Sequence, residues 1–238
     1  RIKRLIPSLT LFLLIVGILI CFFDPDPKFS LRTGISSFFG LSNLYLLKQS
    51  TRYFAESTQL NVFTHTWSLG VEEQFYLLFP FMVWISGFGR QTKNGARNLF
   101  MSILFLIICS LIYFVNLYFN NQPAAYFLMP ARFWEIATGC LLFLGMQKKL
   151  FLFKFLEKIS PTLICLLMIG VLFLSPLSSA VLSTVLIVLL SALFIVCIKD
   201  GTKIFNLFTN KIIIHIGLLS YSLYLWHWGV LSLSRWTI

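Results

Sequence analysis

Charged residues are scarce in this sequence of 238 residues: only 11% are Asp, Glu, Lys or Arg, whereas 58% are apolar and 17% aromatic. A soluble domain carries roughly 25% charged residues, which cover its solvent-exposed surface. The scarcity therefore excludes an ordinary cytosolic enzyme, a disordered segment and a nucleic-acid-binding module. It predicts an all-α, polytopic helical membrane protein, because long apolar helices satisfy their own backbone hydrogen bonds in lipid.

Acidic residues are fewer still, with 8 Asp and Glu against 19 Lys and Arg, for a net charge of +11. Such an excess is typical of the short cytoplasmic loops of membrane proteins, so no nucleic-acid partner is expected. The 5 cysteines are odd in number and scattered through apolar runs, and they predict neither a disulfide framework nor a metal site. Glycine-rich phosphate loops and paired Cys or His motifs are also missing, so we expect no metal and no bound cofactor.

Long apolar runs, by contrast, fill most of the chain. A bilayer core of about 30 Å needs roughly 20 apolar residues per helix. About seven spanning helices are predicted, at residues 5–23, 67–88, 99–119, 126–145, 159–174, 177–198 and 212–234. The run 35–47, from Ile35 to Leu47, is too short for an untilted span. We expect it to form one short re-entrant or half-span helix within a single transmembrane domain over residues 1–238.

Loop charges predict the orientation of these helices. Basic loops at 89–98, 146–158 and 199–211 alternate with uncharged loops at 120–125 and 175–176. The positive-inside rule places the basic loops in the cytoplasm. Residues 24–66 then start and end outside the membrane.

The densest polar group lies at the start of the run 67–88 and has the sequence HTWSLGVEEQFY, from His65 to Tyr76. A charged side chain in lipid costs about 2.5–3.5 kcal/mol, so such residues are expected to face a water-filled or protein-lined cavity. Glu72 and Glu73 are about 100° apart around a helix, so at most one points squarely into a cavity. Capping and the helix dipole explain one carboxylate near a helix start, but not two beside Gln74. The candidate catalytic residues here are Trp67, Glu72, Glu73 and Tyr76, with His65 and Ser68 as secondary candidates.

Two further polar groups lie in later apolar runs. Arg132 and Glu135 are three residues apart and can pair on one helix, either as a structural ion pair or as substrate-facing catalytic candidates. In the sequence SYSLYLWHW, which begins at Ser220, Tyr224 and His227 are secondary candidates. The tryptophans of this segment are typical of an interfacial aromatic belt.

Together and in this order, the three groups resemble the signature motifs of acyltransferase family 3. The opening RIKRLIP, with Arg1 and Arg4, is similar to the Arg-x-x-Arg segment of that family. The resemblance extends over essentially the whole chain, and its central motif is long and specific.

The resemblance implies a membrane O-acyltransferase of bacterial surface polysaccharides such as O-antigen, exopolysaccharide or peptidoglycan. Such an enzyme lies in the bacterial inner membrane, surrounded by lipid, and passes an acyl group, typically acetyl, from acetyl-CoA to a carbohydrate hydroxyl. Arg1 and Arg4 would then bind the phosphates of the acyl-CoA co-substrate, since Arg binds phosphate bidentately. A fused or separate extracytoplasmic SGNH-type domain is a further expectation from the family.

The beginning of the sequence departs from the family pattern. Family members carry a basic residue and a catalytic His on a first membrane helix, and a second helix precedes the Arg-x-x-Arg segment. This sequence opens on Arg1 and lacks both helices. We therefore expect a fragment that is inactive by itself.

Two other functions remain open from the residues alone. A transporter or flippase for lipid-linked intermediates would also need charges lining a passage. A non-enzymatic membrane scaffold explains the helices but gives no reason for the polar motif that follows His65.

Overall fold

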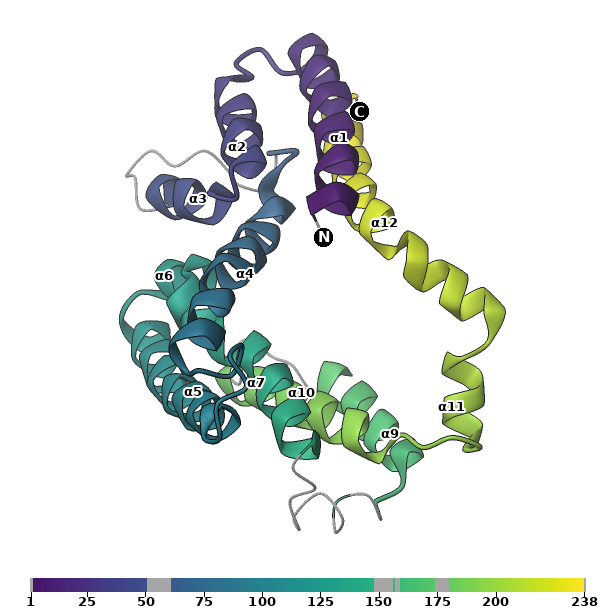
Figure 1. Cartoon of the computed structure of the whole chain (residues 1–238). Helices are drawn as coiled ribbons and strands as arrows, with labels where there is room; N and C mark the ends of the chain where they lie inside the picture. The colour runs from purple at the N-terminus through teal and green to yellow at the C-terminus, as the bar shows by residue number, and fades with distance from the viewer. Residues whose placement is uncertain (1, 51–60, 148–155, 157–158, 174–179, 238) are drawn as a thin grey trace. The chain divides into compact units, whose positions relative to one another are not determined.

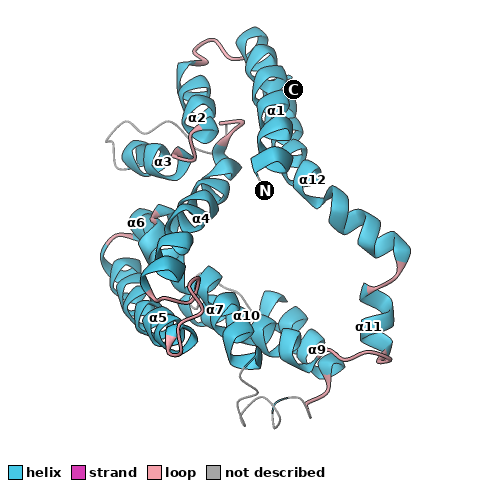
Figure 2. Ribbon diagram, viewed as in Figure 1, coloured by secondary structure: helices cyan, strands magenta, loops and turns pink. Residues whose placement is uncertain are grey.

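A computed structural model describes residues 2–50, 61–147, 156, 159–173 and 180–237 of the chain (Figure 1). The regular secondary structure of this described part is helical, without a strand (Figure 2). Its elements are α1 (Ile2–Phe23), α2 (Lys28–Phe38), α3 (Ser42–Ser50), the 3₁₀ turn η1 (Thr64–Thr66), α4 (Trp67–Ile85), α5 (Gly95–Asn120), α6 (Gln122–Phe127), α7 (Met129–Gln147), α9 (Pro161–Phe173), α10 (Ala180–Cys197), α11 (Lys203–Phe208) and α12 (Lys211–Thr237).

Four helical stretches of the described residues are long and apolar enough to cross a membrane: Leu5–Phe23, Gly95–Asn120, Gln122–Gln147 and Ala180–Cys197. α4 and α12 are also long, but their polar residues lower the hydropathy below that of these four. The all-α, multi-pass membrane fold is thereby confirmed. The count of about seven crossings and the loop orientation stay predictions, and most of the basic loop 146–158 lies outside the described residues.

The single helix expected over residues 35–47 is divided in the structure between α2 and α3. Gly40 separates them with a φ of +66°, a left-handed conformation that residues with a side chain rarely adopt. The Gly40 N–H donates to the Ser37 carbonyl at 3.1 Å, and the Leu41 N–H donates to the Ser36 carbonyl at 2.8 Å. This pattern is a Schellman motif, which ends α2 and turns the chain into α3.

The span expected over residues 126–145 is also interrupted near its start. Leu128 has an extended backbone, with a ψ of 127°, and separates α6 from α7. The predicted basic loop 199–211 contains a short helix, α11.

The chain forms two compact units, and neither is continuous in sequence. Unit 1 comprises Arg1–Leu78, Asn121–Ala131 and His215–Ile238; unit 2 comprises Phe79–Asn120 and Arg132–Ile214. The signature motif at the start of α4 belongs to unit 1. The Arg132 group belongs to unit 2.

In unit 1, α1 packs alongside α12 (Figure 1). The spacing of Leu9, Phe12, Val16 and Ile20 places these buried side chains on one face of α1, against Leu225 of α12. Also in this core are Val62, Phe63 and Leu69. The core therefore joins both ends of the chain to the segment that leads into α4.

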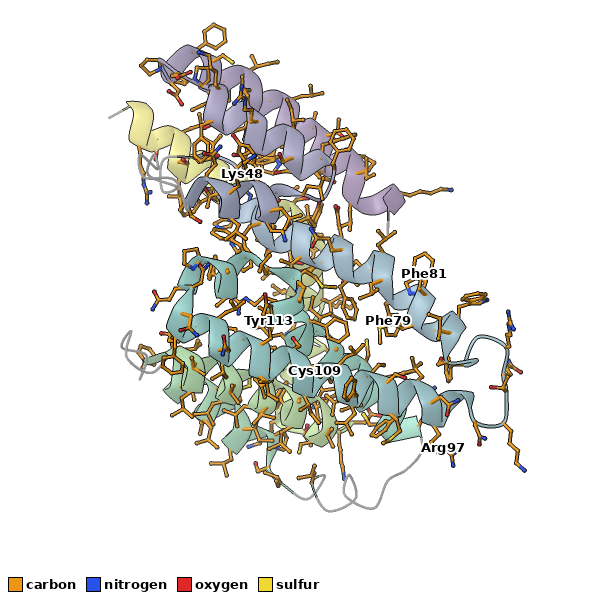
Figure 3. The ribbon with its side chains drawn as sticks, turned by 90° about the vertical axis from the view of Figure 1, so that its left-hand side faces the viewer. Lys48, Phe79, Phe81, Arg97, Cys109 and Tyr113 are labelled. Carbon is orange, nitrogen blue, oxygen red and sulfur yellow. The ribbon has the colours of Figure 1, made fainter. Side chains whose placement is uncertain are left out.

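In unit 2, α9 packs against α10, and α5 contacts α7. Figure 3 shows Cys109 and Tyr113 along α5 and Arg97 near its beginning. Cys109 and Tyr113 are exposed, as expected for a helix surface in contact with lipid. Arg97 was predicted to lie in the basic loop 89–98, but the structure places it in the first turn of α5.

Candidate functional site

The first turns of α4 lie against the α2–α3 corner. Gly70 permits this close approach, because an added Cβ would be 2.9 Å from Asn43 Oδ1 and 3.2 Å from the Gly40 carbonyl oxygen. Gln74 Nε2 donates to that same Gly40 carbonyl at 3.0 Å and to Asn43 Oδ1 at 2.8 Å. Hydrogen bonds from the Gln74 side-chain amide thus connect the signature motif to Gly40 and Asn43 of the corner.

Short polar side chains form a buried network beneath the start of α4. Thr66 Oγ1 donates to the Phe63 carbonyl at 2.7 Å and lies 2.5 Å from Ser37 Oγ. Ser42 Oγ donates to the Thr66 carbonyl at 2.8 Å, and Asn61 Nδ2 donates to Thr33 Oγ1 at 2.7 Å. All the side chains of this network are buried, so its hydrogen bonds hold the motif in one geometry.

Glu72 and Glu73 lie in different environments, as their angular separation predicted. Glu72 is exposed, whereas Glu73 is half-buried. The Glu73 carboxylate lies directly over Gly40, where any added Cβ would overlap it. Glu72 shares a helix face with Ser68, one turn earlier.

On its other side, the motif contacts α12. The Tyr224 hydroxyl donates to the His65 carbonyl oxygen and lies 2.7 Å from Ser68 Oγ. The rings of His65 and His227 are 5.9 Å apart, and His227 Nδ1 is 2.7 Å from the Tyr224 carbonyl oxygen. Since a carbonyl oxygen only accepts, Nδ1 of His227 is the donor in that contact. All four secondary candidates therefore lie together.

His65 is the most buried ionisable group of this cluster, with 9% of its surface exposed. Neither ring nitrogen has a hydrogen bond of ordinary geometry within the described part of the chain. Burial lowers the pKa of His65 from its ordinary value of 6.5 to about 3. The charge of His227 acts in the same direction, and the nearby Leu225 backbone acts in the opposite one. His65 is therefore neutral at physiological pH.

Trp67, the first residue of α4, faces α6. Its ring centroid is 4.3 Å from that of Tyr126 and 5.9 Å from that of Phe127. Tyr76, two turns further along α4, is half-buried with its ring 6.0 Å from that of Phe75.

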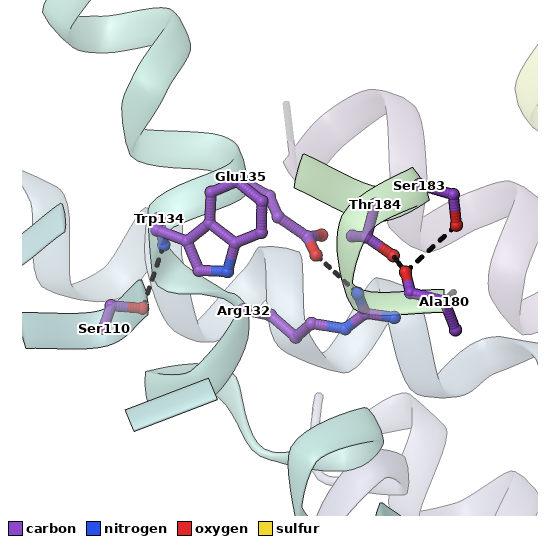
Figure 4. Close-up of polar contacts among 7 residues, drawn as sticks. All are labelled: Ser110, Arg132, Trp134, Glu135, Ala180, Ser183 and Thr184. Carbon is purple, nitrogen blue, oxygen red and sulfur yellow. Dashed lines mark hydrogen bonds and ion pairs between the residues drawn. The ribbon is translucent and has the colours of Figure 1, made fainter. Parts of the chain in front are cut away.

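In unit 2, Arg132 and Glu135 form the ion pair that their spacing on α7 predicted (Figure 4). The Arg132 guanidinium also lies 5.9 Å from the centre of the Phe114 ring on α5. The neighbouring Trp134 N–H donates to Ser110 Oγ at 3.1 Å. Arg132 is mostly buried, which favours a role within protein rather than at a lipid surface.

The two candidates for binding the acyl donor, Arg1 and Arg4, lie at the beginning of the chain, where the structure is described only in part. Arg1 lies outside the described residues. Arg4 lies in the first turn of α1, but its side chain is also outside them. Their role in binding phosphate stays a prediction.

Sequence reasoning missed the residues that position the motif. The missed residues are Thr33, Ser37, Gly40, Ser42, Asn43, Asn61 and Trp228. Trp228 Nε1 donates to the Asn61 carbonyl at 3.0 Å, so it has a specific partner besides any interfacial role. The sequence feature that could have revealed most of them is the series of small polar residues among the apolar residues at 30–43.

The site thus offers carboxylates, hydroxyls and imidazoles at one end of a helix of a multi-pass membrane protein. Among the described residues, no cluster of three or more His, Cys, Asp or Glu side chains could hold a metal ion. The family model described as "Acyltransferase domain" matches residues 1–235. The chain belongs to this acyltransferase family.

Relatives in two bacteria carry related names. The chain is 28% identical to "O-acetyltransferase OatA" of Staphylococcus aureus (strain NCTC 8325 / PS 47), over 97% of this chain and 40% of the relative. It is 27% identical to "Putative peptidoglycan O-acetyltransferase YrhL" of Bacillus subtilis (strain 168), over 98% of this chain and 39% of the relative. The chain thus spans about 40% of the length of these relatives. No solved structure matches it.

Proposed function

We propose that this chain forms the membrane part of an O-acyltransferase of the bacterial inner membrane. It would transfer an acyl group, in the first instance acetyl, from acyl-CoA to a hydroxyl of a cell-surface carbohydrate. Membership of the acyltransferase family supports the reaction class, and the names of the two relatives support acetyl as the group and peptidoglycan as one acceptor.

The observation that carries the proposal is the arrangement around the start of α4. Two carboxylates and the Ser68 hydroxyl lie in the first turns of α4, where the Tyr224 hydroxyl of α12 contacts Ser68. A buried polar network holds this end of α4 in place. A structural helix in lipid has no need of such groups, whose insertion is costly. Acyl transfer does need them, because it requires proton transfer and stabilisation of a developing oxyanion in a fixed geometry.

The reaction can be written with these groups in named roles. The acceptor hydroxyl oxygen attacks the thioester carbonyl carbon; a C–O bond forms, the C–S bond breaks, and the hydroxyl proton ends on the thiol of CoA. Glu72, exposed on the Ser68 face, takes part in the proton transfer. Glu73, seated over Gly40, orients the reacting groups.

The substitution Glu73→Gln in the intact protein tests the proposal. It keeps the shape of the side chain but removes the charge and the basic oxygen, so O-acylation of the envelope carbohydrate should be abolished at normal expression. Mass spectrometry of the released carbohydrate measures the added acyl groups.

Asp26→Asn is the matched control, because Asp26 is an exposed carboxylate outside the motif and pairs only with exposed Lys28 among the described residues. It should leave acylation unchanged. Unchanged acylation in Glu73→Gln would remove Glu73 from the site. Carbohydrate that crosses the membrane without gaining acyl mass would identify a transporter and refute the proposed function.

A further inference from the structure

We infer that Trp67 and Tyr126 form an aromatic platform on which a sugar ring of the carbohydrate acceptor stacks. The inference rests on the proposed function and extends it to the place where the acceptor binds. Tyr126 lies outside the sequence motifs described above, and only the folded chain brings it to Trp67.

The two rings stack against each other at a tilt. Their centroids are 4.3 Å apart with an angle of 42° between the ring planes. Phe127 makes an edge contact with each ring, at 90° to Trp67 and 89° to Tyr126. Tyr126 remains 46% exposed and Trp67 is half-buried, so an aromatic face stays open to a ligand.

This surface is rigid. α6 is capped at its beginning by Asn121, whose Oδ1 accepts the Ala124 N–H at 3.1 Å. At its end, the Phe127 carbonyl accepts a bond of 3.0 Å from Asn43 Nδ2, the same residue that binds Gln74 of α4. The corner that positions Glu73 thus also positions Tyr126. A preorganised aromatic surface loses little conformational entropy when a ligand binds.

The chemistry of the platform fits a sugar better than an acyl chain. The ring C–H groups of a sugar carry partial positive charge, and the negative face of an aromatic ring attracts them as it attracts cations. Polar Asn121 and Gln122 are exposed next to Tyr126 and can bond to hydroxyl groups at the ring edge. An acyl chain would gain nothing from these amides.

The position of the platform fits the reaction. Trp67 immediately precedes Ser68, whose hydroxyl contacts that of Tyr224, and Glu72 follows on the Ser68 face. A sugar stacked on the platform would therefore lie at the same end of α4 as the side chains assigned to proton transfer. Loop charges predict this end of α4 to be outside the membrane, where the acceptor is found.

The experiment compares Tyr126→Leu with Tyr126→Phe in the intact, purified protein. The acceptor is a set of glycan fragments released from the envelope carbohydrate that the wild type acylates in cells. Tyr126→Leu removes the aromatic face and should raise the KM for these fragments about tenfold, with a smaller change in kcat. Tyr126→Phe keeps the face and should restore a KM close to that of the wild type.

Tyr113→Leu is the matched control, because Tyr113 is an exposed tyrosine on α5, far from Trp67 in sequence and in the other unit. It should leave the KM for the fragments unchanged. The KM for acyl-CoA should also change little in the Tyr126 variants, because the residues predicted to bind its phosphates, Arg1 and Arg4, are not part of the platform.

Two results would refute the aromatic platform, and a third would refute the proposed function. Equal KM values for wild type and Tyr126→Leu would overturn the platform while acylation itself continued. An equal rise in Tyr113→Leu would show a general membrane-interface effect and also overturn it. A wild type that adds no acyl group to envelope carbohydrate would instead refute the proposed function.

Discussion

Replacing Gly70 by alanine tests how α4 is seated against the α2–α3 corner. The new Cβ would lie 2.9 Å from Asn43 Oδ1 and 3.2 Å from the Gly40 carbonyl oxygen and from Ser42 Oγ. Asn43 and Ser42 are fully buried, and Gln74 donates a hydrogen bond to Asn43. The neighbours therefore cannot move without losing hydrogen bonds of their own.

The expected free-energy change follows from three contributions. Overpacking a tight contact costs about 1–3 kcal/mol. Weakening the bond between Gln74 and Asn43 costs about 1 kcal/mol more. Alanine favours a helix over glycine by about 0.5–1 kcal/mol, which offsets part of the cost. Gly70→Ala should therefore destabilise the protein by about 1–3.5 kcal/mol.

Thermal unfolding of the purified protein in detergent measures this effect, at roughly 2–4 °C in Tm for each kcal/mol in a chain of this size. Gly139→Ala on α7 is the control, since nothing lies within 4 Å of its added Cβ. It should be neutral or slightly stabilising. If Gly70→Ala proves as stable as Gly139→Ala, the close contact between α4 and the corner is wrong.

Two further predictions concern the same region. Thr66→Val keeps the shape of the buried side chain but removes the hydroxyl that contacts Ser37 and the Phe63 carbonyl, and it should cost about 1–3 kcal/mol in chemical unfolding. Thr138→Val, which loses only a bond within its own helix, should cost clearly less. The lowered pKa of His65, about 3, means that the unfolded chain binds a proton between pH 6.5 and 3 that the folded chain does not. Stability from this group is complete above pH 6.5 and falls by roughly 1.4 kcal/mol per pH unit on acidification, so stability measured from pH 7 to 4 should decline less steeply in His65→Gln; equal slopes would contradict the burial of a neutral imidazole.

The sequence was sufficient to predict interactions between residues that are close to one another along the chain. The spacing of Arg132 and Glu135 predicts their ion pair, since residues three apart meet on a helix surface. The angle between Glu72 and Glu73 likewise predicts that they differ in environment. Apolar run lengths also predict the four described stretches that are long and apolar enough to cross a membrane, because the bilayer imposes that length. The other three predicted crossings stay predictions.

Contacts between segments that are distant in sequence could not be predicted from residue spacing. Ser68 and Tyr224 are 156 residues apart, and periodicity within either helix cannot show that they meet. The break at Gly40 was also missed, because one glycine inside an apolar run is compatible with an uninterrupted helix. Its left-handed φ is stabilised by the side chains of α4 that pack over it, and these are distant in sequence.

Unit 1 is built from three separate stretches of the chain, and the last of them is α12. During synthesis the ribosome therefore produces the HTWSLGVEEQFY segment long before Tyr224, which donates a hydrogen bond to the His65 carbonyl. His65 and Ser68 gain their contact with Tyr224 only after the later helices have been made, so assembly of this part of the site is a late step in biogenesis. Stop codons that remove α12 should leave the earlier helices in the membrane with an unassembled polar end.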